Sequence, residues 1–192
     1  MSHQPRSVDF GRDIFPGSIG ERSVYAHVFD GYWADIGTIR SFFDANLSLL
    51  DRVPRFDFYN EEAPVYTARY HLPNTKINGS RIRESMLAEG SIIDESSISR
   101  SIVGLRCFVR QDTVVESTLL MGSDYYESAE QIAATLARGI PPMGVGRRCT
   151  LVNAIVDKNA HIGDDVQLTN RHGLAEADGD GWYIREGAIV VP

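Results

Sequence analysis

The chain has 192 residues, of which 43% are hydrophobic, enough for the core of one domain or of a small domain joined to part of another. A formal net charge of −7 argues against general nucleic-acid binding, although it allows local basic sites for phosphorylated metabolites. The two cysteines are too few for a disulfide-stapled secreted fold, the first residues carry no apolar signal region, and no apolar stretch could span a bilayer. We therefore expect a cytoplasmic protein with free thiols and no membrane or nucleic-acid partner.

Residues 1–50 are patterned as a strand, a loop and a helix. Small apolar residues alternate with larger side chains over residues 24–29, and this period of two predicts a strand. Thr38 is a good helix N-cap, and apolar residues follow it at helical spacing from Ile39 to Leu50. The loop between the two elements carries Asp35.

Residues 51–78 are predicted to be a connector. They contain three prolines and several aromatic residues and show no strong helical period. Their aromatic content predicts a segment that packs on something rather than a free linker.

Residues 79–192 repeat a six-residue pattern. Branched apolar residues recur at Val103, Val109, Val115 and Met121, at Val145 and Leu151, and at Val156, Ile162 and Leu168. Glycine directly follows four of these positions. The pattern predicts short stacked strands, three to a triangular coil, with the repeated side chain pointing inward and the glycines supplying unusual backbone angles at the corners. Chance spacing in a valine-rich strand protein is the alternative.

The repeat is interrupted in two ways. Steps of five residues, from Ile98 to Val103 and from Leu151 to Val156, are interpreted as tightened corners. Residues 123–144 break the pattern completely, and a helix is predicted from Ala129 to Arg138. We expect this segment to be an excursion from one face of a β-helix.

The segment Gly31–Thr38, with the sequence GYWADIGT, is the most distinctive local motif. An Asp in a loop before a helix is usually a cap or a turn former. A carboxylate at the end of an extended segment can also bind Mg²⁺ together with nucleotide phosphates.

The motif resembles the GYWEDIGT segment of ADP-glucose pyrophosphorylases (glucose-1-phosphate adenylyltransferases). Four further segments resemble this family in the same order: Asp9–Pro16, Ser101–Arg106, Met121–Glu127 and Val156–Gly163. The resemblance implies a mainly β fold, in which a left-handed parallel β-helix of hexapeptide repeats follows the tail of an α/β nucleotidyltransferase domain. It also implies the synthesis of ADP-glucose and pyrophosphate from ATP and glucose 1-phosphate, for glycogen or starch.

The same resemblance implies roles for individual residues. Asp9 and Phe10 match residues that contact the glucose of ADP-glucose, and Trp33 and Asp35 match two more in the sugar-nucleotide site. Asp35 is the expected ligand of Mg²⁺ and the expected catalytic carboxylate. Lys158 matches a lysine that binds an allosteric effector, an anionic phosphorylated metabolite. Arg106 is a weaker effector candidate, with a salt bridge across the β-helix as its alternative role.

The chain departs from the family pattern at several places. Ala34 replaces a glutamate, and His161 stands where an arginine usually lies beside the effector lysine. The family's glycine-rich phosphate loop does not occur in these 192 residues, nor does its second effector lysine. We therefore expect a truncated or remnant chain that makes no ADP-glucose alone and that assembles into a homo- or hetero-oligomer.

Two other functions fit part of the sequence. Hexapeptide-repeat acyltransferases also use left-handed β-helices and rely on a histidine, for which His161 and His172 are the candidates in the later coils. A non-catalytic regulatory or assembly subunit could keep the β-helix for oligomerisation alone. The match over Asp9–Thr38 has no place in the acyltransferase alternative.

Overall fold

A computed structural model describes residues 9–192 of the chain. The chain divides into two compact units, one ending at Trp33 and one running from Ala34 to Pro192. No helix among the described residues is both long enough and apolar enough to cross a membrane.

The first unit contains one turn-rich helical segment. A π-helical turn, η1 (Phe10–Ile14), leads directly into the short helix α1 (Phe15–Ser18). The strand predicted over residues 24–29 is wrong, because no strand forms anywhere in residues 9–33. Alternating side chains make a strand only when a neighbouring strand takes up the backbone hydrogen bonds, and here both sets of side chains are exposed.

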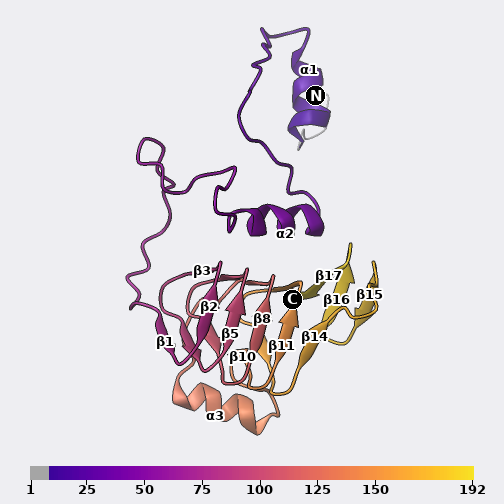
Figure 1. Cartoon of the computed structure of the whole chain (residues 1–192). Coiled ribbons are helices and arrows are strands. Elements are labelled where there is room, and N and C mark those ends of the chain that lie inside the picture. The colour runs from indigo at the N-terminus through magenta and orange to yellow at the C-terminus, as the bar shows by residue number, and fades with distance from the viewer. Residues whose placement is uncertain (1–8) are drawn as a thin grey trace. The chain divides into compact units, whose positions relative to one another are not determined.

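The second unit is built around a parallel β-helix of three sheets (Figure 1). The first sheet stacks β1 (Lys76–Asn78), β4 (Ile92–Asp94), β7 (Phe108–Val109), β10 (Gly144–Val145) and β13 (His161–Ile162). The second stacks β2 (Arg81–Arg83), β5 (Ser97–Ser99), β8 (Val114–Glu116), β11 (Thr150–Val152) and β14 (Gln167–Thr169).

The third sheet ends differently from the other two. It stacks β3 (Met86–Leu87), β6 (Ile102–Val103), β9 (Leu119–Leu120), β12 (Ala154–Val156) and β17 (Ala188–Val191) in parallel. Beyond β17 the sheet continues antiparallel through β16 (Trp182–Arg185) and β15 (Ala177–Gly179). The repeating coil is thus replaced by a meander at this end.

The predicted inward residues form the core of the β-helix. Val103, Val109, Val115, Val145, Leu151, Val156 and Ile162 are all at most 5% exposed and belong to one hydrophobic cluster. This part of the prediction is confirmed. Parallel pairing places each residue on its counterpart one coil away, for example Ile98 on Val115 and Val115 on Leu151.

Met121 does not take the inward position that the six-residue spacing predicts. Leu120 pairs with Val103 and Val156 and is 2% exposed, whereas Met121 packs outside the β-helix. The step from Val115 to Leu120 is therefore five residues, like the step from Ile98 to Val103 in the preceding coil. The entries into β3, β6, β9 and β12 are all tightened corners of this kind, whereas the chain reaches β17 only through the meander.

The corners use glycine less than predicted. Of the four glycines that follow a repeat position, only Gly122 has a positive φ, of 84°. Gly146 is required for another reason, since an added Cβ would lie 2.4 Å from the backbone oxygen of Gly163 in the next coil. Left-handed backbone at the corners is supplied mostly by other residues: Glu84, Glu95, Arg100, Arg106, Asp112, Ser117, Arg148, Asn153, Asn159 and Asp165.

Buried hydroxyls connect successive coils at each corner. The Thr118 Oγ1 donates to the Glu116 carbonyl of its own coil at 2.8 Å, and the Thr118 backbone N–H donates to the Ser101 hydroxyl of the preceding coil at 3.1 Å. The Thr113 hydroxyl likewise accepts from the Cys149 N–H, at 3.1 Å. These bonds pair backbone groups that the strands leave free where the chain turns.

Helix α2 (Ile39–Ser48) covers the outer face of the third sheet. It begins as predicted at Thr38, whose hydroxyl accepts from the Ser41 N–H in a capping box. Phe43 and Leu47 are buried against outward side chains of β9, β12 and β17, namely Leu119, Ile155 and Val190. The predicted amphipathic helix is therefore anchored on the β-helix.

The coil is interrupted between β9 and β10, where residues 121–143 leave it and return. Helix α3 (Ala129–Ala137) lies in this excursion, on the opposite side of the β-helix from α2 (Figure 1). It begins at the N-cap Ser128 and ends one residue before the predicted boundary. None of its residues is buried.

Candidate functional site

The Asp35 loop enters helix α2. The Asp35 Oδ1 accepts the Gly37 N–H at 2.9 Å, and the loop then passes to the cap Thr38. This is a turn that an asparagine could also make. The carboxylate is exposed, so it can also contribute a hard oxygen ligand. The turn and the ligand role are compatible, because the turn uses one oxygen.

The other residues expected in the sugar-nucleotide site lie in the first unit. Asp9 caps η1, where its Oδ1 accepts the Arg12 N–H at 2.6 Å. The Phe10 ring packs on Phe15, with centroids 5.9 Å apart. Trp33 is 75% exposed. Each side chain is accessible, and their roles in substrate binding stay predictions.

The two expected effector residues lie at one corner of the β-helix, where the third sheet turns into the first. Arg106 turns the coil between β6 and β7, and Lys158 turns the coil between β12 and β13. Asp124 lies between them at the start of the excursion. The Ser123 N–H donates to the Leu105 carbonyl at 2.7 Å, and the Asn159 N–H donates to the Gly122 carbonyl at 3.0 Å, which holds the three coils in register.

Asp124 carries the polar contacts of this corner. The Lys158 Nζ lies 2.8 Å from its Oδ1, and the Asn159 Nδ2 donates to its Oδ2 at 2.9 Å. These two hydrogen bonds lower the pKa of Asp124 below its ordinary value. The hydrogen bond to Asp124 and its negative charge raise the pKa of Lys158, so both groups are charged at neutral pH.

Two tyrosines hold Arg106 beside this ion pair. Its guanidinium lies 5.5 Å from the ring centre of Tyr70 and 5.8 Å from that of Tyr126, and its Nη1 donates to the Ser123 carbonyl at 3.2 Å. The alternative role of Arg106, a salt bridge, is not what these contacts show. Tyr70 also lines a groove formed by residues 67–72 with Leu87, Ala88, Glu89 and Leu105.

Asp124, Asn159 and the two tyrosines were not predicted as site residues. Met121–Glu127 and Val156–Gly163 stood out as motifs, but their alignment at one corner depends on which coils are neighbours. The excursion separates Asp124 from Lys158 by 34 positions in sequence, which hides that relation. Recognising that both segments enter the same corner of the repeat could have revealed it.

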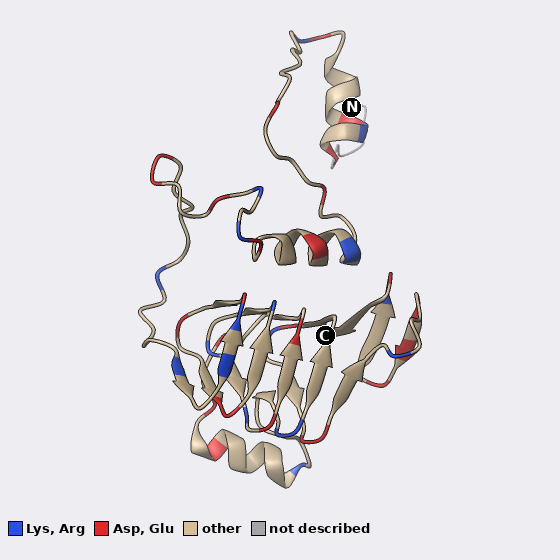
Figure 2. Cartoon of the chain, in the orientation of Figure 1, with Lys and Arg blue, Asp and Glu red and all other residues tan. Residues whose placement is uncertain are grey.

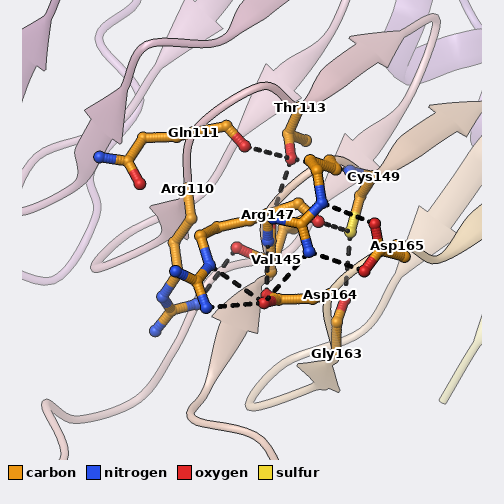
Figure 3. A network of polar contacts seen from close by, with 11 residues as sticks. Arg110, Gln111, Thr113, Val145, Arg147, Cys149, Gly163, Asp164 and Asp165 are labelled. Carbon is orange, nitrogen blue, oxygen red and sulfur yellow. Dashed lines mark hydrogen bonds and ion pairs between the residues drawn. The ribbon is translucent and has the colours of Figure 1, made fainter.

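Within the β-helix, many of the charged residues lie in the turns between strands (Figure 2). A second polar network, at the corner between the first and second sheets, is drawn in Figure 3. There Arg147 pairs with Asp164 at 2.9 Å and Arg148 pairs with Asp165 at 2.7 Å. Because each cation has a carboxylate partner in the adjacent coil, these pairs connect coils.

Arg110 belongs to the same network and fixes the return of the excursion. Its Nη1 and Nη2 donate to the carbonyls of Val145 and Met143, each at 3.1 Å. Partial burial lowers the pKa of Arg110, partly offset by the charge of Asp164. The Glu127 carboxylate accepts the Met143 N–H at 2.7 Å. The two ends of the excursion are thereby tied together.

The histidine and cysteine side chains have structural surroundings. His161 is partly buried, with its Nδ1 2.7 Å from the Pro141 carbonyl, at the end of the excursion. Cys107 and Cys149 are free and buried, as expected, and burial raises the pKa of the Cys107 thiol to about 12. Among residues 9–192, no group of three or more His, Cys, Asp or Glu side chains is arranged to hold a metal ion.

Comparison with families of known proteins gives two matches. Residues 69–192 match the family described as the GLGC left-handed parallel beta-helix domain, which is well over half of the chain. Residues 1–52 match the family described as nucleotidyl transferase. The parallel β-helix is thus left-handed, and the segment before it is the tail of a nucleotidyltransferase domain.

Proposed function

Because the chain belongs to the family of the GLGC left-handed parallel β-helix domain, preceded by a nucleotidyl transferase segment, we propose that it works in a glucose-1-phosphate adenylyltransferase. Membership of this family implies a nucleotide and a sugar phosphate as substrates in general. The adenylyl donor ATP and the acceptor glucose 1-phosphate are our proposal. The observation that carries it is the GYWADIGT loop that leads into the N-cap of α2, in a chain whose later residues form a β-helix of this family.

In the proposed reaction, a phosphate oxygen of glucose 1-phosphate attacks the α-phosphorus of ATP. The bond to the β,γ-diphosphate breaks, so ADP-glucose and pyrophosphate form. Catalysis of such a transfer consists of positioning and of stabilising the charge on the phosphates. Asp9, Phe10 and Trp33 are proposed to contact the sugar nucleotide.

Asp35 is proposed to hold Mg²⁺. Its exposed carboxylate fits a metal that typically binds to one or two protein carboxylates and completes its shell with water and substrate phosphates. When bound, Mg²⁺ would neutralise part of the negative charge on the substrate phosphates. Asp35 contributes the anchoring oxygen, held by the turn to Gly37.

The corner of Arg106 and Lys158 is proposed to bind the effector, a phosphorylated metabolite. The two cations lie at one corner of the β-helix, with a lysine ammonium and a planar guanidinium available for phosphate oxygens. The adjacent groove under Tyr70 leaves room for the organic part of such a ligand. His161 does not join the cations, because its Nδ1 is engaged with Pro141.

The test is reconstitution. The chain is co-expressed with a nucleotide-binding half that carries a glycine-rich phosphate loop, and the purified mixture is assayed for ADP-glucose from ATP and glucose 1-phosphate. We expect activity in the mixture and none for the 192-residue chain, whose sequence contains no such loop. A mixture that forms a complex and still makes no sugar nucleotide would contradict the proposal and favour an assembly subunit.

The acyltransferase alternative has less support. Its catalytic base would be His161 or His172. His161 is partly buried and contacts a backbone carbonyl, and His172 lies in an exposed turn after β14. The nucleotidyl transferase match over residues 1–52 has no place in that function.

A further inference from the structure

The corner of Arg106, Asp124 and Lys158 already contains a negatively charged group, the Asp124 carboxylate. Arg106, Asp124 and Lys158 come from three successive levels of the stacked chain, held in register by the backbone bonds at Ser123 and Asn159. Neighbouring strands lie roughly 4.8 Å apart. A ligand that contacts both Arg106 and Lys158 therefore bridges the level to which Asp124 belongs.

Asp124 makes the contacts that a bound phosphate would make. One oxygen lies against the Lys158 ammonium and the other accepts from the Asn159 amide. The carboxylate thus occupies the donors that suit two oxygens of a phosphorylated ligand. No other carboxylate is paired with Lys158 in the described part of the chain.

The contact is replaceable. Asp124 and Lys158 are 54% and 52% exposed at their side chains, and pairs of this kind are held weakly in water. Asn159 keeps a separate bond to the chain, because its Oδ1 accepts the Asp124 N–H at 2.9 Å. The carboxylate can swing out while the backbone of the corner stays in place.

Arg106 adds a reason for a ligand to displace the carboxylate. Its guanidinium is held by Tyr70, Tyr126 and the Ser123 carbonyl and makes no ion pair with Asp124. A dianion with three or four oxygens could contact both Arg106 and Lys158, whereas the Asp124 carboxylate pairs only with Lys158.

We infer that Asp124 is a built-in competitor of the anionic ligand, occupying the Lys158 and Asn159 donors until a phosphorylated or sulfated dianion displaces it. The inference rests on the proposed effector role of this corner. A ligand binds only if its contacts with this corner are stronger than the contacts of Asp124 that it replaces. Carboxylate monoanions, which offer no more than Asp124 does, therefore bind poorly. Displacement of Asp124 also couples binding to the excursion, because Asp124 is among its first residues.

The test is titration of the 192-residue chain with sulfate, which stays a dianion across neutral pH, followed by calorimetry. Asp124→Asn keeps the shape and removes the competing charge. We expect it to bind sulfate about three- to tenfold more tightly than the unaltered chain. Asp112→Asn, which removes a carboxylate from another corner of the β-helix, is the matched control and should leave the affinity unchanged.

A second measurement, by NMR, uses the unaltered chain and so does not require Asp124→Asn to fold. The side-chain amide resonance of Asn159 should shift when sulfate is added, because the hydrogen bond of this amide to Asp124 is replaced by one to sulfate. Lys158→Gln should abolish binding in both backgrounds.

The failures are distinguishable. If the unaltered chain and Asp124→Asn bind sulfate equally well through Lys158, Asp124 is no competitor, and the effector site stands. If neither binds sulfate and the Asn159 resonance does not move, the proposed effector role of the corner fails as well.

Discussion

The β-helix interior and the segment of residues 9–33 both contain branched apolar side chains, but only the first buries them. Inside the β-helix, Val115 lies between Ile98 and Leu151 of neighbouring coils and is 0% exposed. In the other segment, Val28 is 80% exposed and no strand forms. The difference shows that an apolar pattern specifies a strand only where the chain also supplies partners on both sides.

The largest effect is expected in the stacked core. Leu151→Ala removes a fully buried side chain that contacts the coils above and below, so a cavity remains. We expect a loss of about 2–5 kcal/mol in the free energy of unfolding. Val28→Ala is the control from the exposed segment and should change it by less than about 0.5 kcal/mol. Urea denaturation measures both, and equal effects would contradict the comparison.

The next effect separates a turn former from a metal ligand. In a reconstituted enzyme, Asp35→Asn keeps the hydrogen bond to Gly37 but removes the charge. We expect turnover to fall by about 10²–10³ if the charge stabilises the reacting phosphates. Asp44→Asn, on the exposed side of α2 and paired with Arg40, is the control and should retain turnover.

Thermal melting curves must show that Asp35→Asn and Asp44→Asn are both folded. If Asp35→Asn keeps near-full turnover at saturating Mg²⁺, the only role left for Asp35 is to form the turn to Gly37, and the metal-ligand proposal is wrong.

A smaller effect is expected at the corners. Thr118→Val keeps the shape of a fully buried residue and removes the hydroxyl that bonds to the Glu116 carbonyl. The Glu116 carbonyl keeps the Asn153 N–H, but the Ala154 N–H loses the hydroxyl to which it donates at 3.4 Å, and this should cost about 1–3 kcal/mol. Thr150→Val, on the outward face of β11, is the matched control and should be close to neutral. Equal melting temperatures for the two variants would show that the hydroxyl bonds between coils contribute little.

Much of the fold could be predicted from the sequence because it repeats. The inward residues other than Met121 were predicted correctly, and so were both longer helices, of which α2 begins at the predicted N-cap Thr38. Met121 was misplaced because a constant step of six ignores the shorter step into the third sheet. The corner glycines were misjudged because acidic, basic and amide residues also adopt left-handed backbone there.

The candidate site was less predictable. Lys158 and Arg106 could be proposed from a resemblance, but Asp124 acquires its meaning only when the excursion is folded back and its coil lies beside theirs. The Asp35 loop could be located, because its helix cap follows directly in sequence. Local motifs were therefore visible, whereas contacts across coils were not.

Helix α2 connects the Asp35 loop structurally to the corner of Asp124 and Lys158. Phe43 and Leu47 rest on Leu119 and Ile155, and the strands carrying these two residues run directly into the corners of Asp124 and Lys158. The helix that begins after Asp35 thus packs on the strands that lead to the proposed effector corner. A ligand at that corner that displaced either strand would also displace the surface on which the helix packs, and with it the loop of Asp35.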